Sequence, residues 1–195
     1  RPMKLTLGPI LFNWEADAWR DFYFRIADEA RVDAVAVGEV VCSKRMPFFD
    51  DHFPVVLERL TAAGKEVLVS SLALVTLERE RRRTEELTRA GEWLVEANDI
   101  SCIAHLAGRP HVIGPFVNVY NEGTAQWFAA QGARRICLPP ELPLQSLAAV
   151  AAATALVLLP AGLPAQAQKQ PVFVGAQVCA RCHEGKAAGN QYSHW

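Results

Sequence analysis

The chain alternates short apolar runs of β character with amphipathic helical runs from residue 5 to residue 138. Residues 34–38 are all small and apolar, as expected of a strand that is covered on both faces. Trp19, Phe22 and Ile26 lie at helical spacing with charged residues between them, which predicts an amphipathic helix. The predicted strands are residues 5–11, 34–38, 66–70, 93–97, 112–119 and 135–138. The predicted helices are residues 19–30, 53–60, 78–90, 99–106 and 123–130.

Strands that alternate with helices at this spacing pair in parallel through βαβ crossovers. A closed barrel of this kind needs eight βα units and typically ~250 residues. Only about six units are visible here. We therefore predict an α/β fold: an incomplete TIM-like (β/α) barrel of about six βα units over residues 3–146, with unpaired edges at its first and last strands.

The pattern changes after Pro143. Residues 144–164 contain no charged side chain and are dominated by Ala and Leu. An apolar core followed by small residues is typical of a secretory signal peptide, with cleavage expected after Ala167. A sixth barrel helix or a membrane span are the alternatives, and Pro160 weakens the membrane span. We interpret residues 147–168 as a signal-peptide-like segment whose own start was lost at a junction, and we expect no stable membrane span.

Composition places the chain among globular proteins. It has 195 residues, of which 51% are hydrophobic and 21% are charged. Its net charge of −1 argues against a nucleic-acid binder, which normally carries a basic surplus. Three cysteines are scattered singly, as in proteins of a reducing compartment, whereas Cys179 and Cys182 form a close pair. The two ends of the chain thus indicate different compartments.

The sharpest chemical signal is Cys179-Ala180-Arg181-Cys182-His183. Two thiols three residues apart can add to the vinyl groups of one porphyrin, and the adjoining His can ligate the iron. A zinc-binding or redox C-x-x-C is the alternative. Together with residues 172–178 and 192–195, this motif resembles the first haem segment of multihaem c-type cytochromes. The resemblance implies that residues 169–195 are an exported, periplasmic cytochrome fragment that carries covalent haem c.

A second candidate site follows the strand at residues 34–38. Cys42 lies beside Lys44 and Arg45, whose positive charge favours the thiolate that binds metals or attacks electrophiles. An incidental loop cysteine is the alternative. Four polar residues lie at strand ends on the same edge, where they either line a polar pocket or cap the following helices. These four are Glu39, Glu96, Asn98 and Asn121.

The remaining cysteines and histidines have simpler interpretations. Cys102 and Cys137 are predicted to be small, buried core residues. The three histidines of the barrel portion have no partner at metal-ligand spacing, and we predict structural roles for them. They are His52, His105 and His111. The run at residues 78–83 has mixed charges and is predicted to be a solvated helix face.

Several separate motifs, in order, resemble the UbiV family of ubiquinone-biosynthesis proteins, which belongs to the collagenase-like peptidases. The resemblance covers residues 3–154. The segments that carry it are residues 5–14, 38–45, 94–99 and 116–121. It implies a cytoplasmic iron–sulfur protein that pairs with a UbiU-like sister subunit and supports oxygen-independent hydroxylation of the ubiquinone ring. Cys42 matches the first of the four cysteines that hold the family's [4Fe–4S] cluster, and the other three belong to the second half of the barrel.

Proteolysis is the less favoured alternative, since neither a Ser/His/Asp set nor an H-E-x-x-H motif is visible. A cytoplasmic barrel and an exported haem segment require incompatible compartments. We therefore predict that two unrelated pieces are joined near Ala148 and that the barrel is truncated and inactive as it stands.

Overall fold

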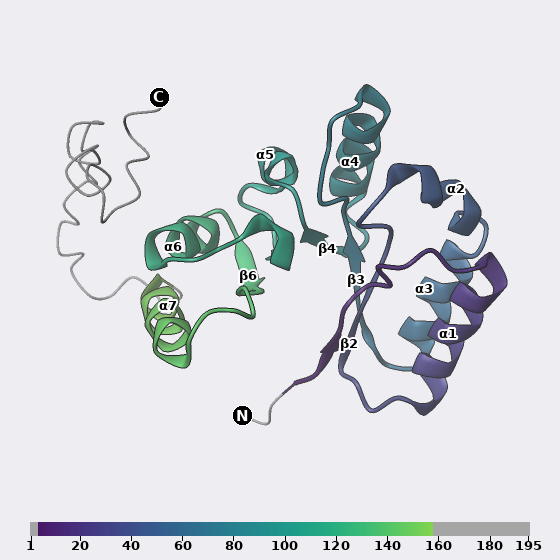
Figure 1. Ribbon diagram of the computed structural model, residues 1–195, viewed down its shortest axis with the longest axis horizontal. Coiled ribbons are helices and arrows are strands. Elements are labelled where there is room, and N and C mark those ends of the chain that lie inside the picture. The colour runs from purple at the N-terminus through teal and green to yellow at the C-terminus, as the bar shows by residue number, and fades with distance from the viewer. Residues whose placement is uncertain (1–3, 158–195) are drawn as a thin grey trace, which may run out of the picture. The chain divides into compact units, whose positions relative to one another are not determined.

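The computed structural model describes residues 4–157. They form six parallel strands in the order β1-β2-β3-β4-β5-β6, with helices between them (Figure 1). The strands are β1 (Thr6–Leu7), β2 (Ala34–Val37), β3 (Glu66–Ser70), β4 (Leu94–Ala97), β5 (His111–Ile113) and β6 (Ala133–Ile136). The α-helices are α1 (Ala16–Glu29), α2 (Met46–Phe49), α3 (Phe53–Ala62), α4 (Glu78–Ala90), α5 (Ile103–Leu106), α6 (Glu122–Ala130) and α7 (Leu144–Val157). Three 3₁₀ turns complete the order, η1 (Ser43–Arg45), η2 (Ile100–Cys102) and η3 (Pro115–Val117). The predicted α/β fold with six parallel βα units is confirmed.

The sheet is curled. Thr6 of β1 and Ile136 of β6 belong to opposite edge strands, yet they line one cavity together with Leu68 of β3. In addition, the Arg135 guanidinium of β6 reaches the Glu66 carboxylate at the start of β3, with an N–O distance of 2.7 Å. Six curled strands with helices outside them make half of a barrel, with a convex outer face and a concave inner face.

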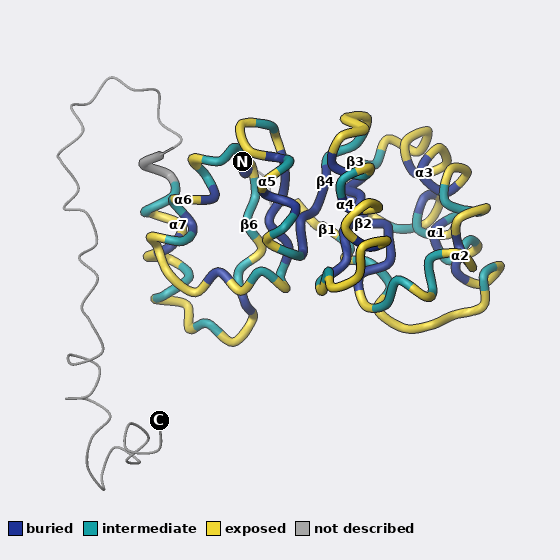
Figure 2. Tube along the Cα trace, turned by 90° about the horizontal axis from the view of Figure 1, so that it is seen from above, coloured by how far each residue is buried: buried dark blue, intermediate teal, exposed yellow. Residues whose placement is uncertain are grey.

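Alternation of side chains along the strands divides the core between these two faces. Val35, Val37 and Val69 point outward and pack with Trp19 and Tyr23 of α1 and with residues of α3. This first cluster is closed by aromatic contacts, since the rings of Trp19 and Phe49 stack with centroids 5.1 Å apart. Burial is concentrated in the strands and in the helix faces turned toward them (Figure 2).

A second outer cluster covers β4, β5 and β6. It combines Val95 and Ile113 of the sheet with Leu106 of α5, Phe128 of α6 and Val150 of α7. Helix α7 therefore packs as the helix that follows the sixth strand. Residues 144–157 thus form a barrel helix, which was an alternative to a signal peptide on sequence grounds. The remainder of the predicted signal-peptide-like segment 147–168, its cleavage after Ala167 and the haem motif lie outside the described residues.

Within residues 4–157, no helix is long and apolar enough to cross a membrane.

Three strand predictions were wrong at their ends. The strand predicted at residues 5–11 is only Thr6–Leu7. β5 stops at Ile113 instead of residue 119, because Pro115 begins the 3₁₀ turn η3 and the chain leaves the sheet. β6 ends at Ile136, so Cys137 lies just beyond the strand and is exposed, not buried as predicted. Cys102 is fully buried, as predicted.

Candidate functional site

The candidate site lies along the edge of the sheet where the strands end. Parallel strands bring their carboxyl ends to one edge, and ligand sites of α/β proteins are found there. Glu39 and Cys42 follow β2, Asn98 follows β4 and Cys137 follows β6, while Ser70 is the last residue of β3. The site is described below from the Cys42 loop toward β6.

Glu39 organises the loop that carries Cys42. Its Oε1 accepts hydrogen bonds from the backbone N–H of Val41 at 2.7 Å and of Cys42 at 2.9 Å. The Glu39 side chain is almost completely buried, whereas Cys42 is half-buried. A carboxylate that receives two backbone donors fixes the backbone between them. Glu39 therefore holds the turn in which Cys42 precedes η1.

A second carboxylate, Glu80, ties this loop to α4. Its Oε1 accepts the Ser43 hydroxyl at 2.6 Å, and its Oε2 accepts the backbone N–H groups of Thr76 and Leu77, both at 2.9 Å. The bond to Leu77 caps the start of α4. The hydrogen bonds from Ser43, Leu77 and Thr76, in that order, lower the pKa of Glu80 to about 2. Glu80 is thus a stable anion that joins the helix terminus to the residue after Cys42.

The cations next to Cys42 are directed elsewhere. The Arg45 guanidinium donates to the Leu11 carbonyl oxygen at 3.1 Å and lies 4.0 Å from Glu39 Oε1. Lys44 is exposed. The Arg45 guanidinium is therefore directed toward Leu11 and Glu39.

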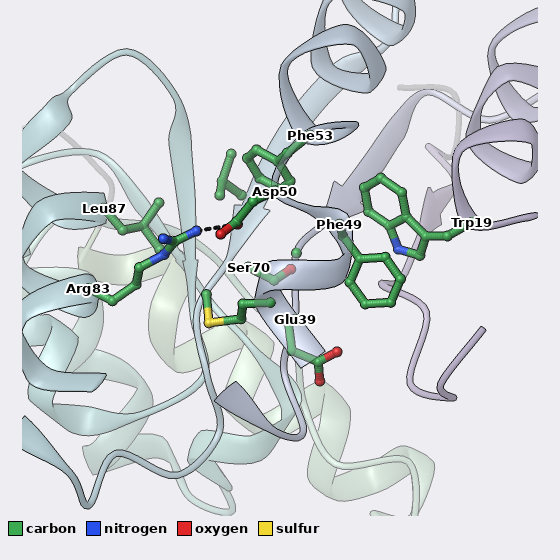
Figure 3. A pocket seen from close by; sticks show the side chains of 11 residues that line it. Trp19, Glu39, Phe49, Asp50, Phe53, Ser70, Arg83 and Leu87 are labelled. Atoms are coloured by element: carbon green, nitrogen blue, oxygen red, sulfur yellow. Dashed lines mark hydrogen bonds and ion pairs between the residues drawn. The ribbon is translucent and has the colours of Figure 1, made fainter. Parts of the chain in front are cut away.

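A small cavity lies between the end of β2 and helices α1, α2 and α4 (Figure 3). Its volume is about 80 Å³, and most of its walls are apolar. The Asp50 carboxylate and the Arg83 guanidinium form an ion pair of 2.5 Å at its rim. Ligand pockets usually have volumes of ~300–1,000 Å³, so this cavity is too small for a substrate. Its lining residues are Trp19, Gly38, Glu39, Met46, Phe49, Asp50, Phe53, Val69, Ser70, Arg83 and Leu87.

A buried polar network joins the ends of β3 and β4. Glu96 Oε2 accepts the Ser70 hydroxyl at 2.6 Å and the Asn98 side-chain amide at 3.3 Å. Asn98 also donates its backbone N–H to the Ser71 hydroxyl at 2.9 Å. The network depends on Gly114, because a Cβ there would lie only 1.9 Å from the Asn98 side-chain oxygen. Glu96 and Asn98, both predicted site residues, are therefore brought together.

The other two predicted pocket residues do not join this network. Glu39 is directed to the Cys42 loop. Asn121 is exposed, and its side-chain oxygen accepts the backbone N–H of Thr124 at 2.9 Å, which caps α6. Asn121 therefore has the capping role that the sequence left open.

The concave face contains a larger cavity of about 420 Å³. Glu96 lines it together with Arg135 and Cys137. Cys137 is exposed as a residue, but partial desolvation of its thiol, and secondarily the negative charge of Glu96, raise the pKa of that thiol. The other lining residues are Thr6, Gly8, Pro9, Leu68, Val112, Pro115 and Ile136. By its size and its convergent polar groups, this cavity has the character of a ligand pocket.

The histidines lie away from these groups. His111 begins β5, at the opposite end of the strands from Cys42, and is fully buried with its Nδ1 2.8 Å from the Arg109 carbonyl oxygen. Burial lowers the pKa of His111. His52 lies 3.4 Å from the Asp17 carboxylate on the surface of the helices. Neither histidine therefore forms a reactive pair with Cys42.

No group of three or more His, Cys, Asp or Glu side chains in residues 4–157 could hold a metal ion. A [4Fe–4S] cluster needs four thiolate ligands. Cys102 is buried in the outer cluster, and Cys137 lines the concave cavity. Among residues 4–157, Cys42 therefore has no second cysteine on its loop that could share a cluster with it. The described residues alone do not fit the cluster.

Sequence reasoning missed three residues that hold the site together, namely Ser70, Ser71 and Glu80. Ser70 ends a buried strand and Ser71 follows it, and a polar pair at that position was an available signal. Glu80 was hidden within the charged run at residues 78–83. Its position three residues after Leu77 is the spacing of a helix-capping glutamate.

The model of peptidase family U32 matches residues 22–159. The match extends from within α1 to α7 and includes the Cys42 loop and strands β2 to β6. It leaves β1 and residues 169–195 outside. No solved structure matches the chain.

Proposed function

The chain belongs to peptidase family U32, and from this premise we propose that it serves as an iron–sulfur accessory subunit for oxygen-independent hydroxylation in ubiquinone biosynthesis. Its partner would be a UbiU-like sister subunit, and its compartment the cytoplasm. The observation that supports the proposal is the Cys42 loop, a half-buried thiol held at the end of β2 by two buried carboxylates. A metal ligand needs such a fixed backbone around it.

The proposal assigns Cys42 one of four ligand positions. The other three thiolates would come from the second half of the barrel, because Cys102 and Cys137 do not lie on this loop and only Cys179 and Cys182 remain in the sequence. Glu39 and Glu80 would orient the Cys42 backbone and keep its loop in one conformation. The bound cluster itself would supply electron transfer.

Anaerobic reconstitution with iron and sulfide tests the proposal, in a version extended to full barrel length. We expect visible absorption of a cluster, with iron and sulfide bound in equal amounts. Cys42→Ser should abolish this binding, whereas Cys137→Ser, a matched control on another loop, should retain it. Failure of the extended version to bind iron and sulfide, or retention of the cluster by its Cys42→Ser variant, would overturn the proposal.

Proteolysis is the second candidate, and the family match favours it. The described residues offer a cysteine on a fixed loop but no histidine beside it, so we rank it below the first. The test is cleavage of denatured collagen by the full chain. We expect none; cleavage that C42S abolishes would replace the iron–sulfur proposal.

A separate proposal concerns residues 169–195, which lie outside both the family match and the described residues. There Cys179, Cys182 and His183 would bind covalent haem c in an exported electron-transfer protein with its own redox partner. Expression with haem-maturation machinery, followed by haem staining of a denaturing gel, tests this. An unstained product would reject covalent attachment.

A further inference from the structure

The concave cavity has walls from both edges of the curled sheet. Thr6, Gly8 and Pro9 line it from β1 and the turn that follows, whereas Ile136 and Cys137 line it from β6 and its end. Leu68 and Val112 from the middle strands are apolar and belong to the small cluster on the inner face. A volume of about 420 Å³ accommodates a small molecule but not a folded segment.

One largely buried residue of this cavity has a carboxylate oxygen that no group in residues 4–157 donates to. Glu96 is 6% exposed, and its Oε2 receives both of its hydrogen bonds, from Ser70 and Asn98. Its Oε1 receives none from residues 4–157, and it is not among the side-chain atoms that are both shielded from solvent and unpartnered. Solvent therefore reaches this oxygen from the cavity. A ligand that donates to Oε1 replaces that water and forms a charge-assisted hydrogen bond.

The charges around the cavity restrict what that ligand can be. Arg135 is the one cation among the lining residues, and its guanidinium is already bonded to Glu66 at 2.7 Å. The Glu96 carboxylate is therefore the charged group in the cavity wall that has no cation paired with it in residues 4–157. An anionic ligand would meet Glu96 without a free cation to balance it.

We propose that this cavity binds a small molecule with a compact apolar body and one hydrogen-bond donor, either a hydroxyl or an ammonium group, which donates to Glu96 Oε1. The apolar body lies against Leu68, Val112 and Ile136. The site does not depend on the iron–sulfur proposal, since no residue of the Cys42 loop lines the cavity.

Protection of Cys137 from alkylation tests the site in the full chain. Cys137 lines the cavity and is exposed, so iodoacetamide reaches it in the free protein. Cys42 is the internal control, and buried Cys102 should remain unreactive. We expect 4-methylphenol or benzylamine to slow alkylation of Cys137 by about threefold or more at saturation, with no change at Cys42. The stronger of the two identifies the donor as hydroxyl or ammonium.

Two matched compounds complete the test. Toluene has the apolar body without the donor and should protect only at about tenfold higher concentration, the loss expected for one hydrogen bond to a charged group. 4-Methylbenzoate carries a negative charge and should not protect. Equal protection by toluene or by the benzoate overturns the assignment to Glu96. Unreactive Cys137 in the free chain overturns the site itself, because another segment then fills the cavity.

Two variants separate binding from folding. In Glu96→Gln the amide oxygen can still accept from Ser70 and Asn98, while the amide nitrogen now offers a donor to the cavity, so protection by 4-methylphenol should weaken about tenfold. Cys137→Trp fills the cavity from an exposed position, so the fold is retained, and saturation-transfer NMR should show loss of 4-methylphenol binding. Unchanged binding in either folded variant rejects the proposal.

Discussion

Glu39 and Glu96 are two buried glutamates on the same edge of one sheet, and they are used in different ways. Glu39 follows β2 and directs its carboxylate to the backbone of its own loop, where Val41 and Cys42 donate to it. Glu96 lies within β4 and directs its carboxylate to a neighbouring strand, where Ser70 donates to it. One carboxylate fixes a turn; the other leaves an oxygen available to a cavity.

The cause of this difference is the backbone that follows each glutamate. After Glu39 the chain turns at once and brings two N–H groups back to the side chain. After Glu96 the strand continues to Ala97, so no local N–H group can reach the carboxylate. The local turn therefore decides whether a buried acid at a strand end is structural or available for binding.

Replacing Gly38 with Ala should have the largest effect on stability. Gly38 precedes Glu39 and lies against Ser70, which donates to Glu96. Its φ is +145°, and a Cβ there would lie 2.6 Å from the Ser70 carbonyl oxygen. We expect Gly38→Ala to lower the free energy of unfolding by about 3 kcal/mol or more. Urea denaturation followed by circular dichroism measures this.

Gly64→Ala is the matched control for that variant. Gly64 also has a positive φ, of +74°, but nothing lies within 4 Å of the position its Cβ would take. The backbone strain alone should cost about 1–2 kcal/mol. Equal destabilisation by the two variants would mean that the close approach of β2 and β3 contributes nothing.

The fold was predictable from the sequence where local patterns decide it. The predicted strand at residues 66–70 and helix at residues 78–90 coincide with β3 and α4. The ends of β5 and β6 were missed because apolar residues continue past both strands while the backbone has already turned away. This is also why Cys137 was expected in the core.

The candidate site was only partly predictable. The position of polar residues at strand ends correctly predicted that Glu96 and Asn98 lie in one network. The roles of Glu39 and Asn121 could not be predicted in this way. Both side chains accept hydrogen bonds from backbone N–H groups, whose direction depends on the local turn. Ser70 was overlooked since its partner, Glu96, is 26 residues away in sequence.

Removing the Glu39 carboxylate should have the next largest effect. Glu39→Ala leaves the N–H groups of Val41 and Cys42 without their acceptor, which should cost about 2 kcal/mol. Hydrogen exchange should accelerate at these two amides, whereas Glu96→Ala should leave their exchange unchanged. Faster exchange in both variants would show that the two carboxylates form one unit, contrary to the comparison above.

Glu80 makes the Cys42 loop sensitive to acid. Its pKa is lowered to about 2 in the folded chain, so its contribution to stability is complete above the ordinary carboxyl pKa of ~4.3 and is lost as the pH falls toward 2. Glu80→Gln should therefore be less stable than the parent at pH 6, and the difference should shrink by pH 3. Urea midpoints at pH 6, 4 and 3 measure this.

The control for Glu80 is Glu86→Gln on the same helix. Glu86 is exposed and receives no hydrogen bond within the part of the chain that the structure describes. Its urea midpoint should follow the parent at every pH. A constant difference between E80Q and the parent from pH 6 to 3 would contradict the role assigned to the Glu80 charge.

The smallest effect concerns the reactivity of Cys137 and tests which glutamate is directed into the cavity. Partial desolvation of the thiol first, and then the Glu96 charge, raise the pKa of Cys137. Glu96→Gln removes the second cause, so the pKa of Cys137 falls and alkylation at pH 8 should accelerate about two- to threefold, because the thiolate is the reactive form. Glu39→Gln removes a buried charge from the same edge but not from this cavity, and should leave the rate unchanged. Peptide mass spectrometry with Cys42 as the reference measures both rates. Equal rates in E96Q and the parent would mean that the Glu96 charge does not reach the cavity, and the distinction between the two glutamates would fail.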